Sequence, residues 1–189
     1  LFMMQFFGVQ IKYIKTNLKV KLKVIGLSNS KKMTLNKDGV DLKNWESILE
    51  NGEKSDPIGF FEATRALNLR NSIFTDITAS DLVASNYAQY LKHSIAVVAC
   101  NKIACSSSIE NYLDLKKLSH KYNVPFLFET NVGAGLPVID TLKHLINSGD
   151  EIKIIHAVLS GSLNYIFNNF NKSTTFGDVV KKAQIEGYT

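Results

Sequence analysis

The sequence predicts an α/β fold built on a doubly wound parallel sheet. Short apolar segments that suit strands alternate along the chain with amphipathic segments that suit helices, and this alternation is typical of βαβ units. Residues 95–100, with the sequence I-A-V-V-A-C, are apolar throughout, as expected for a strand covered on both faces of a parallel sheet. These observations indicate a Rossmann-type sheet.

The expected elements follow one another in order along the chain. We expect strands at residues 22–27, 73–77, 95–100 and 126–129, and helices at residues 44–50, 57–67, 81–92, 107–122 and 136–147. Beyond them, residues 151–160 alternate as one longer strand, and further helices begin at Ser162 and near Thr175. This change of pattern predicts a first domain over residues 1–137 and the start of an α+β domain over residues 138–189.

Composition and charge exclude several classes of protein. Of the 189 residues, 45% are hydrophobic and 21% are charged, which is ordinary for a soluble globular protein; no apolar run approaches the roughly 20 residues of a membrane span. The net charge is +5, yet the early lysines lack the interleaved aromatic residues and motif spacing of nucleic-acid binders. Cys100 and Cys105 fit neither a zinc pattern nor a disulfide framework. We expect a cytoplasmic protein that binds neither membrane nor nucleic acid.

The start of the expected sheet does not match a complete nucleotide-binding domain. The loop G-x-G-x-x-G and the strand before it do not occur, and we interpret the opening L-F-M-M-Q-F-F as the remainder of the first helix. Asn29, Ser30 and Lys31 follow the strand at residues 22–27. An acidic residue here would favour NAD, whereas hydroxyl groups and cations favour the 2′-phosphate of NADP. NADP is therefore favoured over NAD, with a plain polar turn as the alternative.

The next two strand ends carry small residues and a lysine. Thr78, Ala79 and Ser80 follow one strand, where small side chains let the backbone approach a cofactor and a helix start offers free amides. A structural helix cap explains Ser80 nearly as well. Asn101 and Lys102 follow the next strand. A lysine at the carboxyl end of a buried strand suits binding of a phosphate, a carboxylate or a carbonyl, and it suits proton transfer if its pKa is lowered.

The fourth strand end is a Gly-rich turn, E-T-N-V-G-A-G-L-P, at residues 129–137. Its glycines permit a positive φ and the close approach of other groups. Carbonyl oxygens turned outward in such a loop are hard ligands that suit a non-transition cation. A simple tight turn is the alternative interpretation of these residues.

Taken together, these strand ends resemble homoserine dehydrogenase over most of the chain, from about residue 26 onward. The matching segments, in order, are G-L-S-N-S, D-G-V-D-L-K-N-W, D-I-T-A-S, N-K-I-A, E-T-N-V-G-A-G-L-P-V-I, N-S-G-D-E-I, L-S-G-S-L-N-Y-I-F and E-G-Y-T. The long segments are specific, whereas N-K alone is not. D-G-V-D-L-K-N-W is similar in style to the dehydrogenase half of bifunctional aspartokinase–homoserine dehydrogenases.

The resemblance implies NAD(P)-dependent interconversion of L-homoserine and L-aspartate 4-semialdehyde, in threonine and methionine biosynthesis. It implies that residues 1–137 are a partial NAD(P)-binding domain and that the rest begins the catalytic and dimerisation domain. Lys102 would contact the cofactor near the substrate, and Gly161, Ser162 and Glu186 would belong to the homoserine site, with Lys102 and Glu186 as catalytic residues. The full-length protein would be a homo-oligomer, with an aspartokinase domain as a potential fusion partner.

The resemblance also implies a monovalent cation such as sodium. Its ligands would be the Glu129 carboxylate and the carbonyl oxygens of Val132, Ala134 and Leu136. The family's pyrophosphate loop, and its later loop with a substrate-binding aspartate and a second lysine, do not occur in this sequence. N-K-I-A replaces the common N-K-K-A. We therefore expect the 189-residue piece to be inactive alone.

Two other functions are compatible with the residues. One is an NADP-dependent oxidoreductase that acts on a different small aldehyde or alcohol. The other, from a different class, is a non-catalytic basic module, which would bind nucleic acid with a steep dependence on salt. The basic module leaves the turn at residues 129–137 unexplained.

Overall fold

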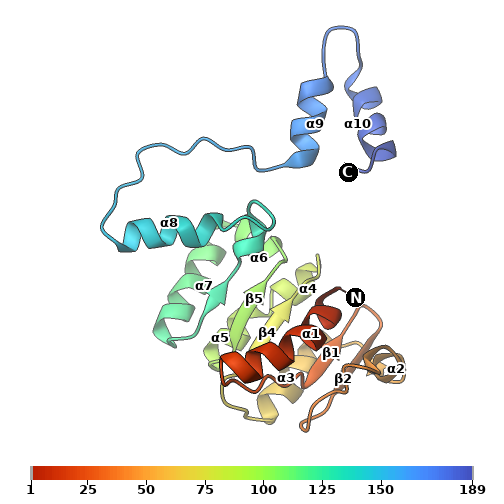
Figure 1. Cartoon of the computed structure of the whole chain (residues 1–189), viewed down its shortest axis with the longest axis vertical. Coiled ribbons are helices and arrows are strands. Elements are labelled where there is room, and N and C mark those ends of the chain that lie inside the picture. Colours follow the sequence, from red (N-terminus) through yellow and green to blue (C-terminus); the bar gives the residue numbers. More distant parts are fainter. Residues whose placement is uncertain (1, 189) are drawn as a thin grey trace. The chain divides into compact units, whose positions relative to one another are not determined.

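The computed structural model describes residues 2–188, with side chains from residue 10 onward, and Leu1 and Thr189 lie outside the described residues. The chain forms two compact units, Leu1–Leu127 and Phe128–Thr189. Figure 1 shows the elements of both in chain order. The boundary between the units lies before residue 137, where the sequence sets the expected domain boundary.

A parallel sheet forms the centre of the first unit. Its strands are β4 (Ile73–Asp76), β5 (Ala96–Ala99) and β6 (Phe126–Leu127), in the order β4-β5-β6. Both pairings are parallel, and Phe74 lies opposite Val97, which in turn lies opposite Phe126. Val97 is fully buried. The expected α/β class with a parallel sheet is confirmed, and so are three of the four strands expected up to residue 129, with β6 shorter than expected.

Helices precede and connect these strands. α3 (Pro57–Ala66) comes before β4, α4 (Asp81–Ala84) and α5 (Tyr87–Lys92) connect β4 to β5, and α6 (Ile103–Ser106) and α7 (Ile109–Lys121) connect β5 to β6. The single helix expected at residues 81–92 is divided into α4 and α5 at Ser85 and Asn86. Both side chains donate to the carbonyl oxygen of Leu82, at 3.0 Å and 2.8 Å, and such bonds compete with the helical backbone pattern.

An aromatic cluster packs the helices against the parallel sheet. Phe74 on β4 stacks on Tyr90 with ring centroids 4.0 Å apart, and Phe61 on α3 meets the same ring edge-on at 5.0 Å. Tyr87 packs edge-on against Phe74 and Phe126. Tyr87 is fully buried. This cluster joins α3 and α5 to strands β4 and β6, so it fixes the positions of the loops that leave the sheet.

A separate antiparallel sheet occupies the beginning of the first unit. It contains β1 (Gly26–Ser28), β2 (Lys32–Leu35) and β3 (Glu53–Lys54), with α1 (Phe2–Asn17) and α2 (Trp45–Glu50) as its helices. Leu27, Val40 and Leu49 form its buried core. The expectation that the strand at residues 22–27 belongs to the parallel sheet is not met, because within residues 2–188 β1 is hydrogen-bonded to β2 alone. A tight turn after Ser28 folds the chain back before it can cross over.

The second unit is helical. It contains the short 3-10 helix η1 (Glu129–Asn131), α8 (Val138–Asn147), α9 (Gly161–Asn169) and α10 (Phe176–Ile185). Helices α9 and α10 pack through Ile166, Val179 and Ala183. The strand expected at residues 151–160 is not formed in this structure: the segment has no assigned helix or strand. None of the described helices is long and apolar enough to cross a membrane.

Candidate functional site

The carboxyl ends of β4 and β5 form the edge at which ligands bind in open α/β sheets. Asp76 at the end of β4 lies opposite Ala99 at the end of β5. The loop of residues 77–80 leads from β4 to α4, and the loop of residues 100–102 leads from β5 to α6. Five of the predicted cofactor-binding residues therefore lie on two neighbouring loops.

A buried polar network lies beneath these loops. Among the described residues, Asp76 and Asn101 are the buried polar or charged ones, each 1% exposed. Oδ1 of Asp76 accepts from the Thr78 amide at 2.7 Å, and Oδ2 accepts from the Tyr87 hydroxyl at 2.6 Å and from Nδ2 of Asn101 at 3.0 Å. Buried polar groups are costly unless they are hydrogen-bonded. Here the carboxylate uses both of its oxygens.

Asn101 extends this network from one loop to the other. Its Nδ2 also donates to the Ser80 carbonyl oxygen at 3.0 Å, and its Oδ1 accepts from the Ile103 amide at 3.1 Å. The side-chain amide thus joins the end of β5 to the loop after β4. The predicted contact of Asn101 with a cofactor stays a prediction, since in this structure its amide group is bonded to protein partners.

The accessible groups at this edge are Thr78, Ala79 and Lys102, all exposed. Ser80 is half-buried, and its Oγ accepts from the Val83 amide at 3.4 Å, which caps α4 as the alternative interpretation of this residue had it. A phosphate or carboxylate at this edge would meet the Thr78 hydroxyl and the Lys102 ammonium group. The structure therefore gathers the predicted residues of both loops on one surface.

The phenol of Tyr87 keeps its proton in this environment. Burial raises the pKa of Tyr87 well above its ordinary value of 10.0, and the hydrogen bond to Asp76 raises it further. The hydroxyl group therefore donates to Asp76 at every ordinary pH. Nothing in the sequence pattern singled out Tyr87 beyond its place on an apolar helix face.

Asn29, Ser30 and Lys31 lie in the hairpin turn between β1 and β2, which belongs to the antiparallel sheet. The amides of Lys31 and Lys32 both donate to Oδ1 of Asn29 at 2.8 Å, an arrangement typical of Asn in tight turns. All three predicted residues are exposed. Their role in cofactor binding stays a prediction.

The turn at residues 129–137 is closed by its own glutamate. Oε1 of Glu129 accepts from the Ile139 amide and Oε2 from the Asp140 amide, both at 2.9 Å. These amides belong to the first turn of α8, where backbone donors lack partners in the helix and a negative charge is favourable. Sequence reasoning gave Glu129 as a cation ligand and missed this capping role.

Two successive residues of this turn have a left-handed backbone. They are Gly133 with a φ of +72° and Ala134 with a φ of +52°, so the second position is an alanine rather than the next glycine. A Cβ atom at Gly133 would lie 2.9 Å from Cγ2 of Val138. Glycine is therefore required at residue 133 both by backbone conformation and by space.

The expected cation ligands form a chemically suitable set. One carboxylate and three carbonyl oxygens are hard donors of the kind that alkali and alkaline-earth cations take. Glu129 is shared with α8, and the Leu136 carbonyl oxygen accepts from the Val138 amide at 2.9 Å. Among the described residues, no three His, Cys, Asp or Glu side chains gather as an alternative metal site.

The predicted substrate residues meet at one end of the α9–α10 pair. The Ser162 hydroxyl at the start of α9 donates to the carbonyl oxygen of Tyr188, after α10. Tyr165 stacks on Tyr188 with ring centroids 4.2 Å apart. A hydrogen bond to Glu186 raises the pKa of Tyr165 to about 12, and Lys182 lies 3.8 Å from a Glu186 oxygen. The structure thus brings Ser162 and Glu186 together through two tyrosines that sequence reasoning missed.

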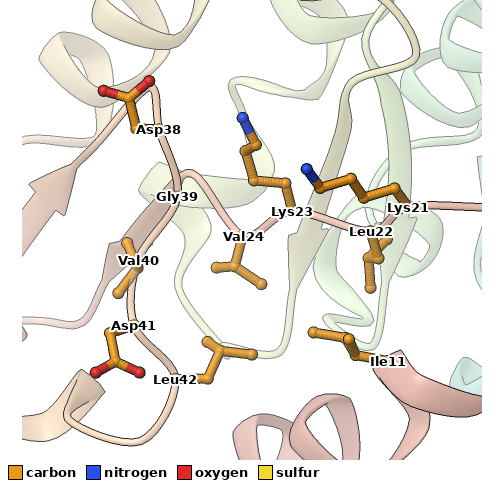
Figure 2. A pocket seen from close by; sticks show the side chains of 10 residues that line it. All are labelled: Ile11, Lys21, Leu22, Lys23, Val24, Asp38, Gly39, Val40, Asp41 and Leu42. Carbon is orange, nitrogen blue, oxygen red and sulfur yellow. The ribbon is translucent and has the colours of Figure 1, made fainter. Parts of the chain in front are cut away.

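A cleft of about 340 Å³ is lined by Ile11 of α1 and by two segments next to the antiparallel sheet, residues 21–24 and 38–42. Figure 2 shows the apolar side chains of Ile11, Val24 and Leu42 converging there, while Lys23 and Asp38 extend in another direction. Two lysines and two aspartates line it, so their charges balance. None of the predicted site residues lines this cleft, and we assign it no ligand.

A parallel sheet with these groups at its carboxyl edge defines the class of nucleotide-binding α/β proteins of Rossmann type. Comparison with known proteins narrows this class. Residues 137–189 match the family model of homoserine dehydrogenase. The chain is 38% identical over 182 residues to bifunctional aspartokinase/homoserine dehydrogenase 2, chloroplastic, of Zea mays, a match that covers 95% of this chain and 20% of that relative. The expected resemblance to homoserine dehydrogenase is confirmed.

Solved structures agree in fold. A crystal structure of a Candida auris protein of unknown function is 33% identical with a TM-score of 0.79, and the match covers 96% of this chain and 52% of that one. A hyperthermophilic archaeal homoserine dehydrogenase in complex with NADPH is 24% identical with a TM-score of 0.70, covering 96% of this chain and 59% of that one. The chain therefore spans about a fifth of that curated relative, and 52% to 59% of these solved chains.

Proposed function

We propose that this chain is part of an oxidoreductase that interconverts L-homoserine and L-aspartate 4-semialdehyde with NADP(H). The observation that carries the proposal is the exposed edge formed by Thr78, Ala79 and Lys102, supported by the buried network below it. The similarity to homoserine dehydrogenases over nearly the whole chain supports the proposed reaction. When bound, the nicotinamide supplies the hydride chemistry, and the protein supplies binding and orientation.

The first unit holds the nucleotide in this proposal. Lys102 presents a compact positive charge that suits a phosphate or a substrate carbonyl group. The small, exposed side chain of Ala79 allows the backbone to approach the nucleotide. Asn29, Ser30 and Lys31 stay candidates for the ribose end, and the absence of an acidic residue among them favours NADP over NAD. The NADPH complex of the archaeal relative supports this choice.

The second unit supplies groups for the substrate. Gly161 and Ser162 begin α9, where the amides of a helix N-terminus favour a carboxylate. Glu186 carries a negative charge that suits the ammonium group of an amino acid. Tyr165 fixes one side of that carboxylate by its hydrogen bond. These groups suit a small amino acid with a free carboxylate and a free ammonium group, as homoserine has.

We also infer a monovalent cation, such as sodium, bound by Glu129 and by the carbonyl oxygens of Val132, Ala134 and Leu136. The hard oxygen donors support this inference, and the ion would stabilise the turn before α8. The effect of the cation on stability is measured by comparing thermal unfolding in sodium chloride with unfolding in choline chloride at equal ionic strength. Sodium is expected to raise the unfolding midpoint of the chain, and Glu129→Gln is expected to remove the difference. Equal midpoints in both salts would contradict the cation.

The setting of the activity is also part of the proposal. A fusion with an aspartokinase domain is supported by the bifunctional relative from Zea mays. A homo-oligomer is proposed for the full-length protein, and the cytoplasm is proposed as its location, whereas that relative is named chloroplastic. Size-exclusion chromatography with light scattering on the full-length protein measures its oligomeric state.

Nucleotide binding by the purified chain is the first test. Titration followed by NADPH fluorescence is expected to saturate, with weaker binding of NADH. Lys102→Met is expected to weaken NADPH binding about tenfold, because a charged contact to phosphate contributes roughly 1.4 kcal/mol. Lys92→Met is the matched control: this exposed lysine ends α5, just before β5 begins, whereas Lys102 follows the end of β5. Equal effects of the two substitutions would contradict the proposed edge.

Substrate binding and turnover complete the test. Isothermal titration calorimetry is expected to show that L-homoserine binds with higher affinity than L-serine. Glu186→Gln is expected to weaken homoserine binding. Glu151→Gln, at an exposed carboxylate paired with Lys153, is the control and is expected to change nothing. The chain alone is expected not to turn over. NADPH-linked reduction of aspartate 4-semialdehyde above a blank without protein would contradict that expectation.

A further inference from the structure

We propose that Asp76 and Tyr87 are positioning residues, which set the spacing of the loops at residues 77–80 and 100–102 and so control nucleotide affinity without touching the nucleotide. This inference rests on the proposed function, because it assumes that these loops bind NADP(H). Neither residue has been given a role by the sequence motifs. The inference is carried by their burial and by the hydrogen bonds that converge on one carboxylate.

The carboxylate of Asp76 holds its own loop first. Its Oδ1 accepts from the Thr78 amide at 2.7 Å, and the Thr78 hydroxyl in turn accepts from the Ser80 amide at 3.1 Å. The backbone of the loop after β4 is thereby bent toward the strand from which it came. Thr78 and Ala79 are left exposed at the outside of this bend.

The same carboxylate holds the second loop through Asn101. Oδ2 of Asp76 accepts from Asn101 at 3.0 Å, and Asn101 accepts from the Ile103 amide at 3.1 Å. Lys102 lies between these two residues in the chain, so its backbone is fixed on both sides while its side chain is exposed. The position of Lys102 relative to Thr78 therefore depends on the buried carboxylate of Asp76.

Tyr87 anchors that acceptor to the body of the unit. Its ring is fully buried between Phe74 and Phe126, and its hydroxyl donates to Oδ2 of Asp76 at 2.6 Å. Because the ring is held by packing on two strands, the hydroxyl is a fixed point rather than a mobile partner. Removing it would leave the carboxylate with one donor fewer in a buried position.

Only a carboxylate satisfies these three donors. An Asn side chain at residue 76 offers one oxygen and one NH₂ group. Whichever way it is turned, its NH₂ group faces a donor, either the Thr78 amide or the Asn101 amide group. Asp76→Asn is therefore expected to loosen the loops although it preserves shape, and Tyr87→Phe is expected to loosen them less because it deletes one donor and keeps the ring.

Two measurements on the purified chain test the inference. By hydrogen exchange, the Thr78 and Ile103 amides are expected to exchange faster in Tyr87→Phe while the amides of β5 keep their protection. By NADPH titration, the dissociation constant is expected to rise about threefold to tenfold in Tyr87→Phe, and tenfold or more in Asp76→Asn. Tyr87→Phe keeps the test decisive if the aspartate variant fails to fold.

Tyr90→Phe is the matched control. Tyr90 lies on the same helix and is 2% exposed, and among the described residues its hydroxyl is not one of the donors that converge on Asp76. It is expected to bind NADPH within twofold of the unchanged chain. Equal losses in Tyr90→Phe and Tyr87→Phe, or unchanged exchange at Thr78 and Ile103, would overturn the inference. Failure of the unchanged chain to bind NADPH would instead contradict nucleotide binding by this chain, while the exchange measurement still decides the positioning.

Discussion

Strands were expected both at the carboxyl edge of the parallel sheet and at residues 151–160, yet only the sheet edge contains paired strands. At the sheet edge, every strand has a bonded neighbour and the polar groups beneath the loops are buried and hydrogen-bonded. In the segment, Ile154 is 73% exposed and Val158 is 74% exposed, and no strand is formed. An alternating pattern predicts which face of a strand is apolar, but a strand also requires a partner.

The difference separates two sources of order in this chain. The first unit contains its own packing, in the form of an aromatic cluster and a parallel sheet. In the second unit, α8 contains no buried residue, and Ile166 with Val179 and Ala183 is its buried cluster among the described residues. Substitutions in the two units should therefore have effects of different size and extent.

Tyr87→Ala should have the largest effect. It removes a fully buried ring and one donor to Asp76, and we expect a loss of about 4 kcal/mol in the free energy of unfolding. Urea unfolding followed by circular dichroism measures it. Ile154→Ala, in the exposed segment, is expected to change stability by less than about 0.5 kcal/mol. Similar losses in the two variants would erase the contrast.

Glu129→Gln should have the next largest effect, confined to the second unit. A glutamine can accept from one amide of α8 but not from both, so we expect local opening to become easier by about 1–2 kcal/mol. Hydrogen exchange at the Ile139 and Asp140 amides measures this change, with the amides of β5 as an internal reference. A slower exchange, or an equal change in β5, would speak against a local cap.

A matched pair of helix caps sharpens the comparison further. Ser108 accepts from the Asn111 amide at the start of α7, and Ser160 accepts from the Leu163 amide at the start of α9, both at 3.2 Å. Each change to alanine is expected to cost about 1 kcal/mol. Ser108→Ala should lower the midpoint of cooperative unfolding, whereas Ser160→Ala should alter exchange within α9 alone. If both variants shift the same transition equally, the two units unfold together.

The smallest expected effect is a loss of stability in alkali. The pKa of Tyr87 is raised from 10.0 in the folded chain, so above pH 10 the unfolded chain releases a proton that the folded chain keeps, and stability falls as pH rises. The Asp76 carboxylate acts on this phenol electrostatically in the same direction. At pH 10.5 we expect the unchanged chain to lose about 0.8 kcal/mol in its free energy of unfolding, and Tyr87→Phe to avoid this loss. Parallel stability curves from pH 8 to pH 10.5 would contradict this.

Local patterns predicted the parallel sheet well. The apolar run at residues 95–100 contains β5, and Pro57 begins α3 as its ring geometry favours. The helix expected from residue 107 begins at Ile109, with Ser108 as its cap. These features depend on neighbours in the sequence, and for that reason a single sequence contains enough information about them.

Features that depend on distant residues were missed. The antiparallel pairing of β1 with β2 was missed for another reason, since the strand pattern alone does not distinguish antiparallel from parallel pairing. The role of Asp76 was missed because its partners come from α5 and from the loop after β5. An acidic residue as the last residue of a buried strand was the available signal for a buried network.

If the proposed cation binds, Glu129 couples its binding to the start of α8. Its carboxylate accepts from the Ile139 and Asp140 amides, so the stability of the first turn of α8 depends on the position of that carboxylate. A cation that draws on the same oxygens changes the strength of the cap, and by reciprocity the order of α8 changes the affinity for the cation. Hydrogen exchange at the first turn of α8 would then differ between the ion-bound and ion-free chain. Ions of different size would change the strength of this cap by different amounts.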